Sequence, residues 1–295
     1  MPELPDITVY VERLTATVVN HTPEAVVVHN PFVLRSVEPP LSAFTGRPIV
    51  GVHRLGKRIV LVFESEHFLV LHLMIAGRLR WRAPGKRIAG KLALASLTFP
   101  HGTLYLTEAG TKRRASLHAV QGHEALQRFD RGGLEPMTCS VAEFGNMLRS
   151  ENHTIKRSLT DPRLMSGIGN AYSDEMLHAA QLSPMVLTSK LTDDQIARLH
   201  GAMQATLASW TDRLRVEAGE AFPETVTAFH DAMAVHGRYG KPCPVCGAPV
   251  QRIRYADNET NYCARCQTGG RVLADRALSR LLKGDFPRTL DELAD

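Results

Sequence analysis

Cys243-Pro-Val-Cys246 and Cys263-Ala-Arg-Cys266, separated by sixteen residues, decide how the C-terminal part of this 295-residue chain folds. Each Cys-x-x-Cys pair forms one knuckle, and two knuckles supply four thiolates, so the pattern predicts one tetrahedral Zn²⁺ site. Four protein ligands leave no open coordination position, and the predicted zinc is therefore structural. Two disulfides or four unrelated thiols are the alternatives, and the paired two-residue gaps favour zinc over both.

The segment around the cysteines is basic. Between residues 236 and 266 two acids, Asp257 and Glu259, stand against five cations, which are Arg238, Lys241, Arg252, Arg254 and Arg265. The whole chain carries a net charge of +5 and a pI of about 9.0, which favours an anionic partner without separating nucleic acid from an acidic membrane. A basic hairpin that binds zinc favours nucleic acid.

No apolar run reaches the roughly eighteen residues of a membrane span, and the first residues show no signal-peptide pattern. Four of the five cysteines belong to the predicted zinc site, and a chain with that thiol usage is typical of a reducing compartment. We therefore expect a cytoplasmic protein that does not enter a membrane.

The order of the local patterns predicts an α+β fold with segregated parts. Short apolar runs bounded by charged or turn residues predict strands at 59–63, 68–72, 92–99 and 103–107. Apolar residues spaced three to four apart predict helices at 8–18, 141–150, 171–180 and 192–214.

Gly132-Gly-Leu-Glu-Pro136 marks the boundary between the strand-rich and helix-rich halves. The expected domains are 1–133, 134–235, a zinc module at 236–268 and a C-terminal extension at 269–295. Within the extension, residues 272–282 predict an amphipathic helix. We interpret it as a cap with no special role, and a partner contact is the alternative.

Residues 67–107 contain no Asp or Glu, while Arg78, Arg80 and Arg82 alternate within them. On a strand these three side chains project from one face, where a row of guanidinium groups suits phosphate oxygens. A solvated strand edge is the alternative interpretation. The long absence of acids favours nucleic acid.

Gly167-Ile-Gly-Asn170 is a second candidate for anion binding. Its glycines permit a tight turn, and Asn170 is predicted to cap a helix that begins at residue 171. Free backbone amides at a helix start bind anions. With Lys156 and Arg157 one helix earlier, the segment predicts a phosphate clamp, although capped turns of this kind are common.

The chain begins Met1-Pro2-Glu3-Leu4-Pro5-Asp6. If Met1 is removed, Pro2 is a secondary amine that can attack an electrophilic sugar carbon and form an iminium. An α-amine has a reference pKa of about 7.7–8.0, so a useful fraction is neutral at physiological pH. Glu3 could transfer protons during ring opening. Many chains begin in this way without any chemical reason, so this signal alone is weak.

The combination of motifs is more specific than any one of them. In order along the chain stand Pro2-Glu3, Leu55-Gly-Lys57, Gly133-Leu-Glu-Pro136, Ser166-Gly-Ile-Gly-Asn170-Ala-Tyr172, Val235-His-Gly-Arg238 and the four cysteines. Together they resemble the formamidopyrimidine-DNA glycosylase / endonuclease VIII family of bacterial base-excision repair. The resemblance extends to about residue 267. It implies a β-sandwich domain, a helix–two-turn–helix domain and a zinc-finger β-hairpin, with damaged double-stranded DNA in the basic cleft between them and a monomeric enzyme.

The resemblance also implies roles for single residues. Pro2 would attack C1′ of the damaged nucleotide, which has left the base stack, and hold the sugar as a Schiff base. Glu3 would assist opening of the sugar ring, and β,δ-elimination would follow. Lys57 matches a lysine that contacts the phosphate or sugar near the lesion, and Asn170 matches an asparagine that contacts a flanking phosphate.

Several positions depart from the family pattern. Asp6 replaces a glutamate, and Asn258 stands where the zinc hairpin of the family carries a phosphate-binding arginine, with Arg252, Arg254 and Arg265 as possible substitutes. Met74 or Ile75 takes the place of the void-filling methionine. Residues 108–115, with Lys112, Arg113 and Arg114, stand near the usual intercalating loop, which keeps its basic charge but loses its wedge. Residues 217–227 differ from the lesion-capping loop of 8-oxoguanine enzymes.

Because the lesion-contacting positions differ most, the substrate stays open between oxidised purines, which the family favours, and oxidised pyrimidines. A non-catalytic zinc-finger protein that binds damaged or abasic DNA is a further alternative, motivated by Asn258 and the altered loop. A zinc-ribbon protein outside this family is the weakest alternative, because Pro2 and Asn170 match.

Overall fold

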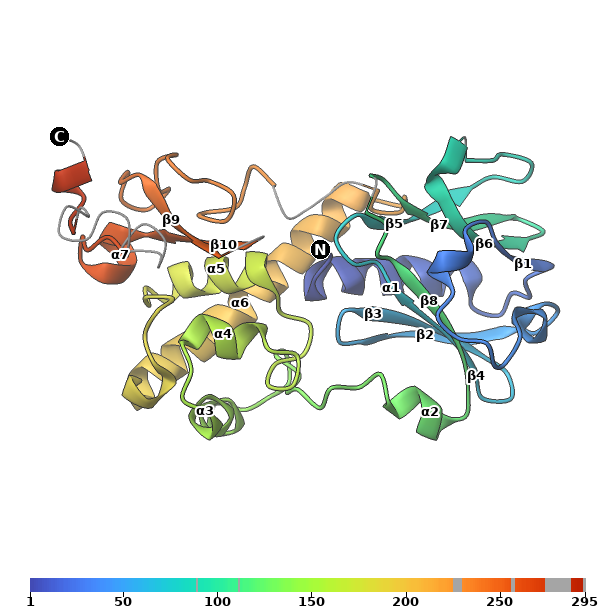
Figure 1. Ribbon diagram of the computed structural model, residues 1–295, viewed down its shortest axis with the longest axis horizontal. Helices are drawn as coiled ribbons and strands as arrows, with labels where there is room; N and C mark the ends of the chain where they lie inside the picture. Colours follow the sequence, from blue (N-terminus) through green and yellow to red (C-terminus); the bar gives the residue numbers. More distant parts are fainter. Residues whose placement is uncertain (89, 111, 225–229, 256–257, 274–287, 294–295) are drawn as a thin grey trace. The chain divides into compact units, whose positions relative to one another are not determined.

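The computed structural model describes the chain except for residues 89, 111, 225–229, 256–257, 274–287 and 294–295 (Figure 1). The chain forms two compact units. The first consists of Met1–Arg131 with Trp210–Thr227, and the second of Gly132–Ser209 with Ala228–Asp295. The finer division into four domains stays a prediction.

The first unit contains two four-stranded antiparallel sheets. One sheet has the order β1 (Ala25–Val28), β6 (Ala93–Phe99), β7 (Gly102–Glu108), β5 (Gly77–Arg82). The other has the order β2 (Ile49–Leu55), β3 (Arg58–Phe63), β4 (His67–His72), β8 (Ser116–Gln121). Leu61 and Leu69 of the second sheet share one buried core with Leu97 and Leu104 of the first. The predicted β-sandwich is confirmed, and the four predicted strands correspond to β3, β4, β6 and β7.

Helix α1 (Leu4–Val18) packs against β2 and β3 and buries Ile7, Tyr10 and Leu14 in the shared core (Figure 1). It begins four residues before the predicted start at residue 8. Apolar spacing predicted the later start, whereas the capping groups of Glu3 and Asp6 fix the earlier one. A short helix, α2 (His123–Gln127), contributes Leu126 to a smaller cluster on the outer face of β3 and β4.

The second unit is helical apart from one hairpin. Its helices are α3 (Val141–Ser150), α4 (Ile155–Thr160), α5 (Asn170–Ala179), α6 (Asp193–Ala218, ending in the first unit) and α7 (Ala264–Thr268). The hairpin pairs β9 (Val250–Tyr255) with β10 (Asn258–Cys263). Short 3₁₀ turns are η1 (Pro31–Val33), η2 (Leu41–Phe44), η3 (Gly90–Leu92), η4 (Thr188–Lys190) and η7 (Asp291–Leu293).

Helix α5 is the buried centre of the second unit. It packs between α4 and β10 (Figure 1), and its residues 171–178 are all buried. Gly133 packs against the loop that precedes α5. A Cβ atom at this position would stand 2.6 Å from the Pro162 carbonyl oxygen, so only glycine fits. The neighbouring Glu135 accepts a 2.6 Å hydrogen bond from the Ser166 hydroxyl. Two motifs far apart in the sequence therefore meet in one structural joint.

The C-terminal extension is described only in part. The predicted helix at 272–282 lies largely outside the described residues. Before that gap, the backbone N–H of Leu273 donates to the Tyr262 hydroxyl at 2.7 Å. Among the helices that the structure describes, none has the length and apolar character needed to cross a membrane.

Candidate functional site

Pro2 lies buried at the start of α1, in a small pocket of the first unit. The pocket is also lined by Asp6, Val9, Tyr10, Arg78, Leu214 and Pro223. Glu3 and Asp6 cap α1 reciprocally, and the backbone N–H of Glu3 donates to Asp6 Oδ2 at 2.8 Å. The aspartate that departs from the family pattern thus has a structural task, because it fixes the backbone between Pro2 and the helix.

Charged groups converge on the amine at this end of the chain. Burial lowers the pKa of the Met1 amine; Glu3 and Asp6 oppose this shift, while the cations of Arg78 and Lys57 add to it. A lowered pKa increases the neutral, nucleophilic fraction of an amine at neutral pH. The fold therefore brings the predicted residues Glu3 and Lys57 to the N-terminus.

Lys57 sits in the two-residue turn between β2 and β3. Gly56 precedes it with φ of +60°, a conformation that side chains rarely adopt, so the Gly-Lys order sets this turn. Burial lowers the pKa of Lys57, and Glu3 partly offsets the shift. These two groups are 54 residues apart in the sequence, and the fold brings them within electrostatic reach of each other.

Arg78 is a component that the sequence did not assign to this site. It is only 6% exposed, and its guanidinium Nη1 donates to the carbonyl oxygens of Gly77 at 2.5 Å and Ile75 at 3.4 Å. Its Nε finds no hydrogen-bond partner among the described residues. The alternation of Arg78, Arg80 and Arg82 predicted that the three side chains share one face of a strand. Only the fold shows that Arg78 lines the same pocket as Pro2.

The other two arginines of the predicted row are engaged by one carboxylate. Arg80 and Arg82 lie 2.9 and 2.7 Å from the two oxygens of Glu224. The register, which pairs Arg80 with Tyr105 and Arg82 with Thr103, confirms that they share a face. One carboxylate balances only part of the charge of two guanidinium groups that stay about a third exposed, so their role in phosphate binding stays a prediction.

Two further contacts fasten the segment before Glu224 to the sandwich. The Tyr10 hydroxyl donates to the Pro223 carbonyl oxygen at 2.5 Å. Phe222 stacks on Trp81 with ring centroids 6.3 Å apart. Residues 222–224 belong to the segment that the sequence marked as divergent, and Pro223 among them lines the pocket around Pro2.

Met74 lies in the turn between β4 and β5, with φ of +54°. A non-glycine residue in this region is strained, and such strain concentrates at functional sites. Gly77 closes the turn, and a Cβ atom there would stand 2.2 Å from the Leu73 carbonyl oxygen. Met74 is half-buried and Ile75 is 59% exposed, so both apolar side chains remain available at the tip.

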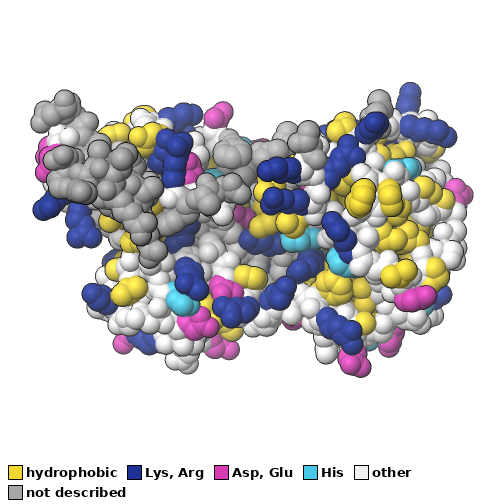
Figure 2. Space-filling model, in the orientation of Figure 1, with side chains coloured by type: hydrophobic (Ala, Val, Ile, Leu, Met, Phe, Trp, Pro, Cys, Tyr) yellow, Lys and Arg dark blue, Asp and Glu magenta, His cyan; other side chains and the backbone are white. Residues whose placement is uncertain are grey.

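Arg113 and Arg114 lie in the connection between β7 and β8. The buried Glu108 carboxylate accepts hydrogen bonds from the backbone N–H groups of Arg114 and Ala115, each at 2.9 Å. Arg114 is exposed and Arg113 half-buried. Figure 2 shows Lys and Arg side chains gathered over the part of this unit where β5 and β7 lie in Figure 1.

Asn170 is the first residue of α5, and Gly169 holds the N-cap position. The prediction that Asn170 caps the helix is wrong, because its side-chain amide donates instead to the Glu259 carbonyl oxygen at 2.7 Å. A side chain at the first helical position points away from the orphan amides that a cap serves. Asn170 therefore ties the start of α5 to the zinc-finger hairpin.

Lys156 forms an ion pair with Asp174, which is 1% exposed, and also donates to the Asn170 carbonyl oxygen at 3.3 Å. The second oxygen of Asp174 binds His236 Nδ1 at 2.8 Å and the backbone N–H of Asn261 at 3.1 Å. One buried carboxylate thus joins α4, α5, the 235–238 motif and β10.

Glu175, the next residue, accepts three backbone hydrogen bonds from Ala234, Val235 and His236 at 2.7–2.9 Å. Burial raises the pKa of Glu175, and these three donors oppose the shift. Neither Asp174 nor Glu175 was identified from the sequence, although they closely follow the motif that ends at Tyr172.

The four cysteines come together at the base of the hairpin. Their Sγ atoms all lie within 4.8 Å of one another, with 3.9 Å between Cys243 and Cys266 and 3.4 Å between Cys246 and Cys263. A tetrahedral zinc with Zn–S bonds of about 2.3 Å places its sulfurs about 3.8 Å apart. The donor set therefore fits a structural zinc, as predicted. Outside the four sulfurs, Nε2 of His178 on α5 lies within hydrogen-bonding distance of Cys243 Sγ, at 3.3 Å.

Asn258 begins β10 and is exposed. Of the three arginines considered as substitutes for the missing guanidinium, Arg252 stacks over the Tyr239 ring at 4.0 Å and lies 3.5 Å from Glu259. Arg265 donates to the Cys246 carbonyl oxygen at 3.3 Å. Arg254 is exposed, on the strand opposite Glu259.

A β-sandwich with a small pocket around Pro2, joined in one chain to a helical unit whose hairpin carries four clustered cysteines, has the parts expected of a zinc-finger DNA-repair enzyme. Three domain families match the chain. The formamidopyrimidine-DNA glycosylase N-terminal domain matches residues 1–115. The formamidopyrimidine-DNA glycosylase H2TH domain matches 133–214, and the zinc finger found in FPG and IleRS matches 240–269.

Individual relatives agree with the domain matches. An uncharacterised formamidopyrimidine-DNA glycosylase-like protein of Mycobacterium tuberculosis is 40% identical over 51% of this chain and 94% of its own length. The formamidopyrimidine-DNA glycosylase of Thermus thermophilus is 32% identical over 92% of this chain and 100% of its own. The chain belongs to the formamidopyrimidine-DNA glycosylase family, whose members are DNA glycosylases and abasic-site lyases.

Solved structures give the same architecture. The crystal structure of the Thermus thermophilus protein aligns with a TM-score of 0.75 and 30% identity, over 90% of this chain and 98% of that one. The Lactococcus lactis Fpg in complex with abasic-site DNA aligns with a TM-score of 0.79 over 90% and 99%, and at 24% identity it supports the fold alone. The predictions of family, fold class and enzyme class are confirmed.

Proposed function

We propose that this chain excises damaged bases from double-stranded DNA and cleaves the resulting abasic site, with Pro2 as the nucleophile. The observation that carries this proposal is the buried amine end of the chain, where Glu3, Lys57 and Arg78 converge. The surroundings that lower the pKa of the Met1 amine would act on the Pro2 amine once Met1 is removed, and would keep it nucleophilic.

The chemistry follows from this arrangement. The Pro2 nitrogen bonds to C1′ while the bond from C1′ to the base breaks, and the base leaves with a proton. The sugar ring then opens as O4′ takes a proton from Glu3, and an iminium links Pro2 to the sugar. The Glu3 carboxylate formed in that step accepts a C2′ proton as the 3′ phosphate leaves, and in a second elimination water accepts a further sugar proton as the 5′ phosphate leaves. Water then hydrolyses the remaining iminium and releases the Pro2 amine.

DNA would be held by residues from both units. We propose that Lys57 contacts the phosphate or sugar beside the lesion and that Met74 fills the space left by the extruded nucleotide. Arg113 and Arg114 would contact the backbone near it. In the second unit, Asn170, Lys156 and Asn258 would meet flanking phosphates, with Asp174 fixing the lysine.

The substrate class is proposed to be oxidised purines, with oxidised pyrimidines as the alternative, because residues 217–227 diverge. The enzyme would act as a monomer in the cytoplasm. The alternative of binding damaged or abasic DNA without catalysis, motivated by the exposed amide of Asn258 in the place of a guanidinium, is disfavoured by membership in a family of DNA glycosylases and abasic-site lyases.

Borohydride trapping on a duplex with a single abasic site tests the proposal. Mass spectrometry first establishes that Met1 is absent, since an acylated Pro2 nitrogen cannot act. A covalent protein–DNA adduct is expected, because borohydride reduces the iminium. Absence of an adduct from protein with a free Pro2, while the duplex is still bound, would overturn the enzyme mechanism in favour of the binding protein. Duplexes with single oxidised purines or pyrimidines then identify the substrate class.

A further inference from the structure

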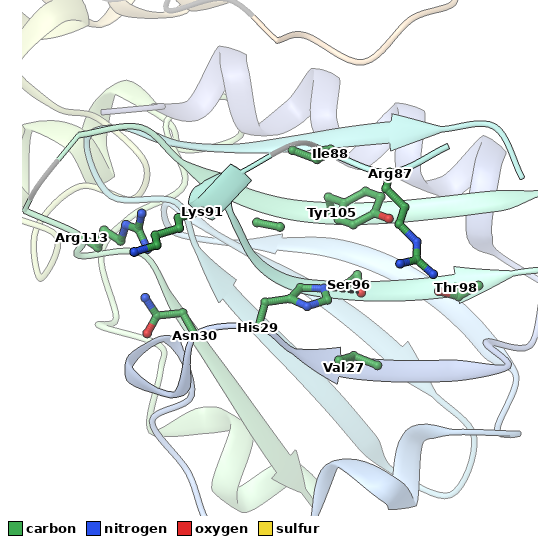
Figure 3. Close-up of a pocket in the computed structure, with 11 residues that line it drawn as sticks. Val27, His29, Asn30, Arg87, Ile88, Lys91, Ser96, Thr98, Tyr105 and Arg113 are labelled. Carbon is green, nitrogen blue, oxygen red and sulfur yellow. Dashed lines mark hydrogen bonds between the residues drawn. The ribbon is translucent and has the colours of Figure 1, made fainter. Parts of the chain in front are cut away.

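A separate cavity of about 690 Å³ lies on the outer face of the β1-β6-β7-β5 sheet (Figure 3). That volume falls within the range of small-molecule sites. Tyr105 and Ser96 form its floor, and Arg87 and Lys91 come from the segment that connects β5 to β6. It shares no lining residue with the pocket around Pro2.

The sheet register explains why this face is polar. Val27, Ser96, Tyr105 and Arg80 are paired in one row across the four strands, so their side chains project from the same face. The residues between them in the sequence, such as Leu97 and Leu104, project into the sandwich core. The outer face therefore presents hydroxyl groups and an aromatic ring where the inner face presents leucines.

The charge of the cavity is of one sign. Its lining includes Arg87, Lys91 and Arg113 and no acidic residue. None of these three cations forms an ion pair with another described residue, in contrast to Arg80 and Arg82 nearby. Residues 67–107 also contain no Asp or Glu that could neutralise them. Cations without a protein counter-ion attract a ligand anion.

The floor carries a buried aromatic group with an unused polar atom. Tyr105 is 8% exposed and stacks on His29 with ring centroids 6.3 Å apart. His29 Nε2 and the Ser96 hydroxyl are 2.8 Å apart, whereas the Tyr105 hydroxyl has no hydrogen-bond partner among the described residues. Because Tyr105 lines the cavity, its hydroxyl is accessible from the cavity and can bond to a ligand or to water.

The cations lie at two ends of this floor. Figure 3 shows Lys91 and Arg113 on one side and Arg87 beyond Tyr105 on the other. A nucleotide within a DNA strand has this pattern, because one nucleoside lies between two phosphates. Aromatic rings between cations are also how proteins hold unpaired nucleotides.

We propose that this cavity is a second nucleotide-binding site, which takes a nucleoside with a phosphate on its 3′ side, its 5′ side or both. Arg87 binds one phosphate, Lys91 and Arg113 bind the other, and the Tyr105 hydroxyl meets the sugar or base between them. The ligand is either a free nucleotide or an unpaired nucleotide of a DNA strand. The site shares Arg113 with the DNA-binding residues proposed above, but it does not depend on the chemistry proposed for Pro2.

Calorimetric titration of the full-length, zinc-loaded protein tests the site with thymidine 3′,5′-bisphosphate and with pentathymidylate. The double variant Arg87→Gln/Lys91→Gln is expected to weaken binding by about tenfold or more, since both side chains are exposed and their loss leaves the core intact. Tyr105→Phe keeps the ring but removes the hydroxyl, and is expected to weaken binding about threefold. Arg128→Gln, an exposed arginine outside the cavity, is the matched control and is expected to have no effect.

The outcomes separate the sources of the ligand. Binding of both probes, each lost in the double variant, assigns a free nucleotide site. Binding of pentathymidylate alone, again lost in the double variant, assigns a strand site. Unchanged binding in the double variant, or no binding of either probe by the wild type at millimolar concentration, would overturn the proposal. Pro2→Gly is expected to bind normally, so failure of the Pro2 mechanism leaves this result unaffected.

Discussion

The zinc hairpin and the pocket around Pro2 are built on opposite principles. The four ligands of the hairpin lie within 24 residues of sequence, and their spacing alone predicted their geometry. The Pro2 pocket gathers groups from α1, the β2–β3 turn, β5 and the segment after α6, which are more than 200 residues apart. Chemistry confined to one local motif can be read from a sequence, whereas chemistry assembled from distant strands depends on the fold.

The two regions also differ in how their charges are balanced. In the second unit, the buried acids Asp174 and Glu175 are satisfied by Lys156, His236 and backbone amides, which fixes the hairpin to α5. At the N-terminus, the cations of Arg78 and Lys57 and the acids Glu3 and Asp6 all act on one buried amine. A buried guanidinium Nε without a partner among the described residues occurs in both units, on Arg78 and on Arg238.

The largest effect is expected from removing the proposed nucleophile or the proposed proton-transfer group in the Pro2 pocket. Pro2→Gly and Glu3→Gln are each expected to lower base excision by on the order of 10³-fold or more, since glycine offers only an unconstrained primary amine and glutamine cannot transfer a proton. Glu64→Gln, on an exposed position of the same unit, is the matched control. Single-turnover kinetics on a lesion duplex provide the measurement. Excision that survives both changes would refute the assignment.

Loss of zinc is expected to act on binding instead of chemistry. Cys263→Ser removes one of four thiolates and should weaken duplex binding by about tenfold or more, because the metal supplies the folding energy of the hairpin. Cys139→Ser makes the same chemical change at a buried cysteine outside the cluster and should bind normally. Filter binding and circular dichroism measure the two effects. Normal affinity in zinc-free protein would contradict this role.

A smaller effect on the excision rate is expected from the ion pairs of Glu224 with Arg80 and Arg82. Glu224→Gln removes the charge that fastens residues 222–224 beside the Pro2 pocket. Partly exposed ion pairs contribute up to about 1 kcal/mol each, so excision should slow by about three- to tenfold. Glu220→Gln, an exposed acid in the same segment, is the control. Equal excision rates in the Glu224→Gln and Glu220→Gln variants would show that the ion pairs of Glu224 do not affect the Pro2 pocket.

A pH dependence of stability is expected from a histidine of the sandwich. Burial, with the cations of Arg58 and Lys57, lowers the pKa of His72 from its ordinary 6.5 to about 4. The unfolded chain takes up the proton first as the pH falls, so this contribution is present above pH 6.5 and is lost progressively towards pH 4.

Urea unfolding at about pH 7 and about pH 4.5 measures this effect. The wild type is expected to lose about 1–2 kcal/mol more than His72→Gln between these values, after allowance for solvent screening of a partly buried group. The variant at the exposed His123, His123→Gln, should behave as the wild type. An equal loss in wild type and His72→Gln would show that His72 does not carry the dependence.

Local patterns predicted the elements better than their connections. Short apolar runs bounded by charged or turn residues located β3, β4, β6 and β7, because most residues of these strands are buried. The start of α1 was missed by four residues, since it depends on the reciprocal cap of Glu3 and Asp6. Asn170 looked like a cap by its type, and its true partner on β10 lies 89 residues away.

By itself, the sequence determined the zinc ligands, the order of sheets before helices, and the family to which the chain belongs. Each of these rests on residue types at fixed short spacing, which local geometry enforces. The tertiary structure decided that Arg78 joins the Pro2 pocket while Arg80 and Arg82 turn to Glu224, and that Lys156 meets Asp174. Those outcomes depend on which distant charges come within hydrogen-bonding distance, and that distance is set by the packing of the core.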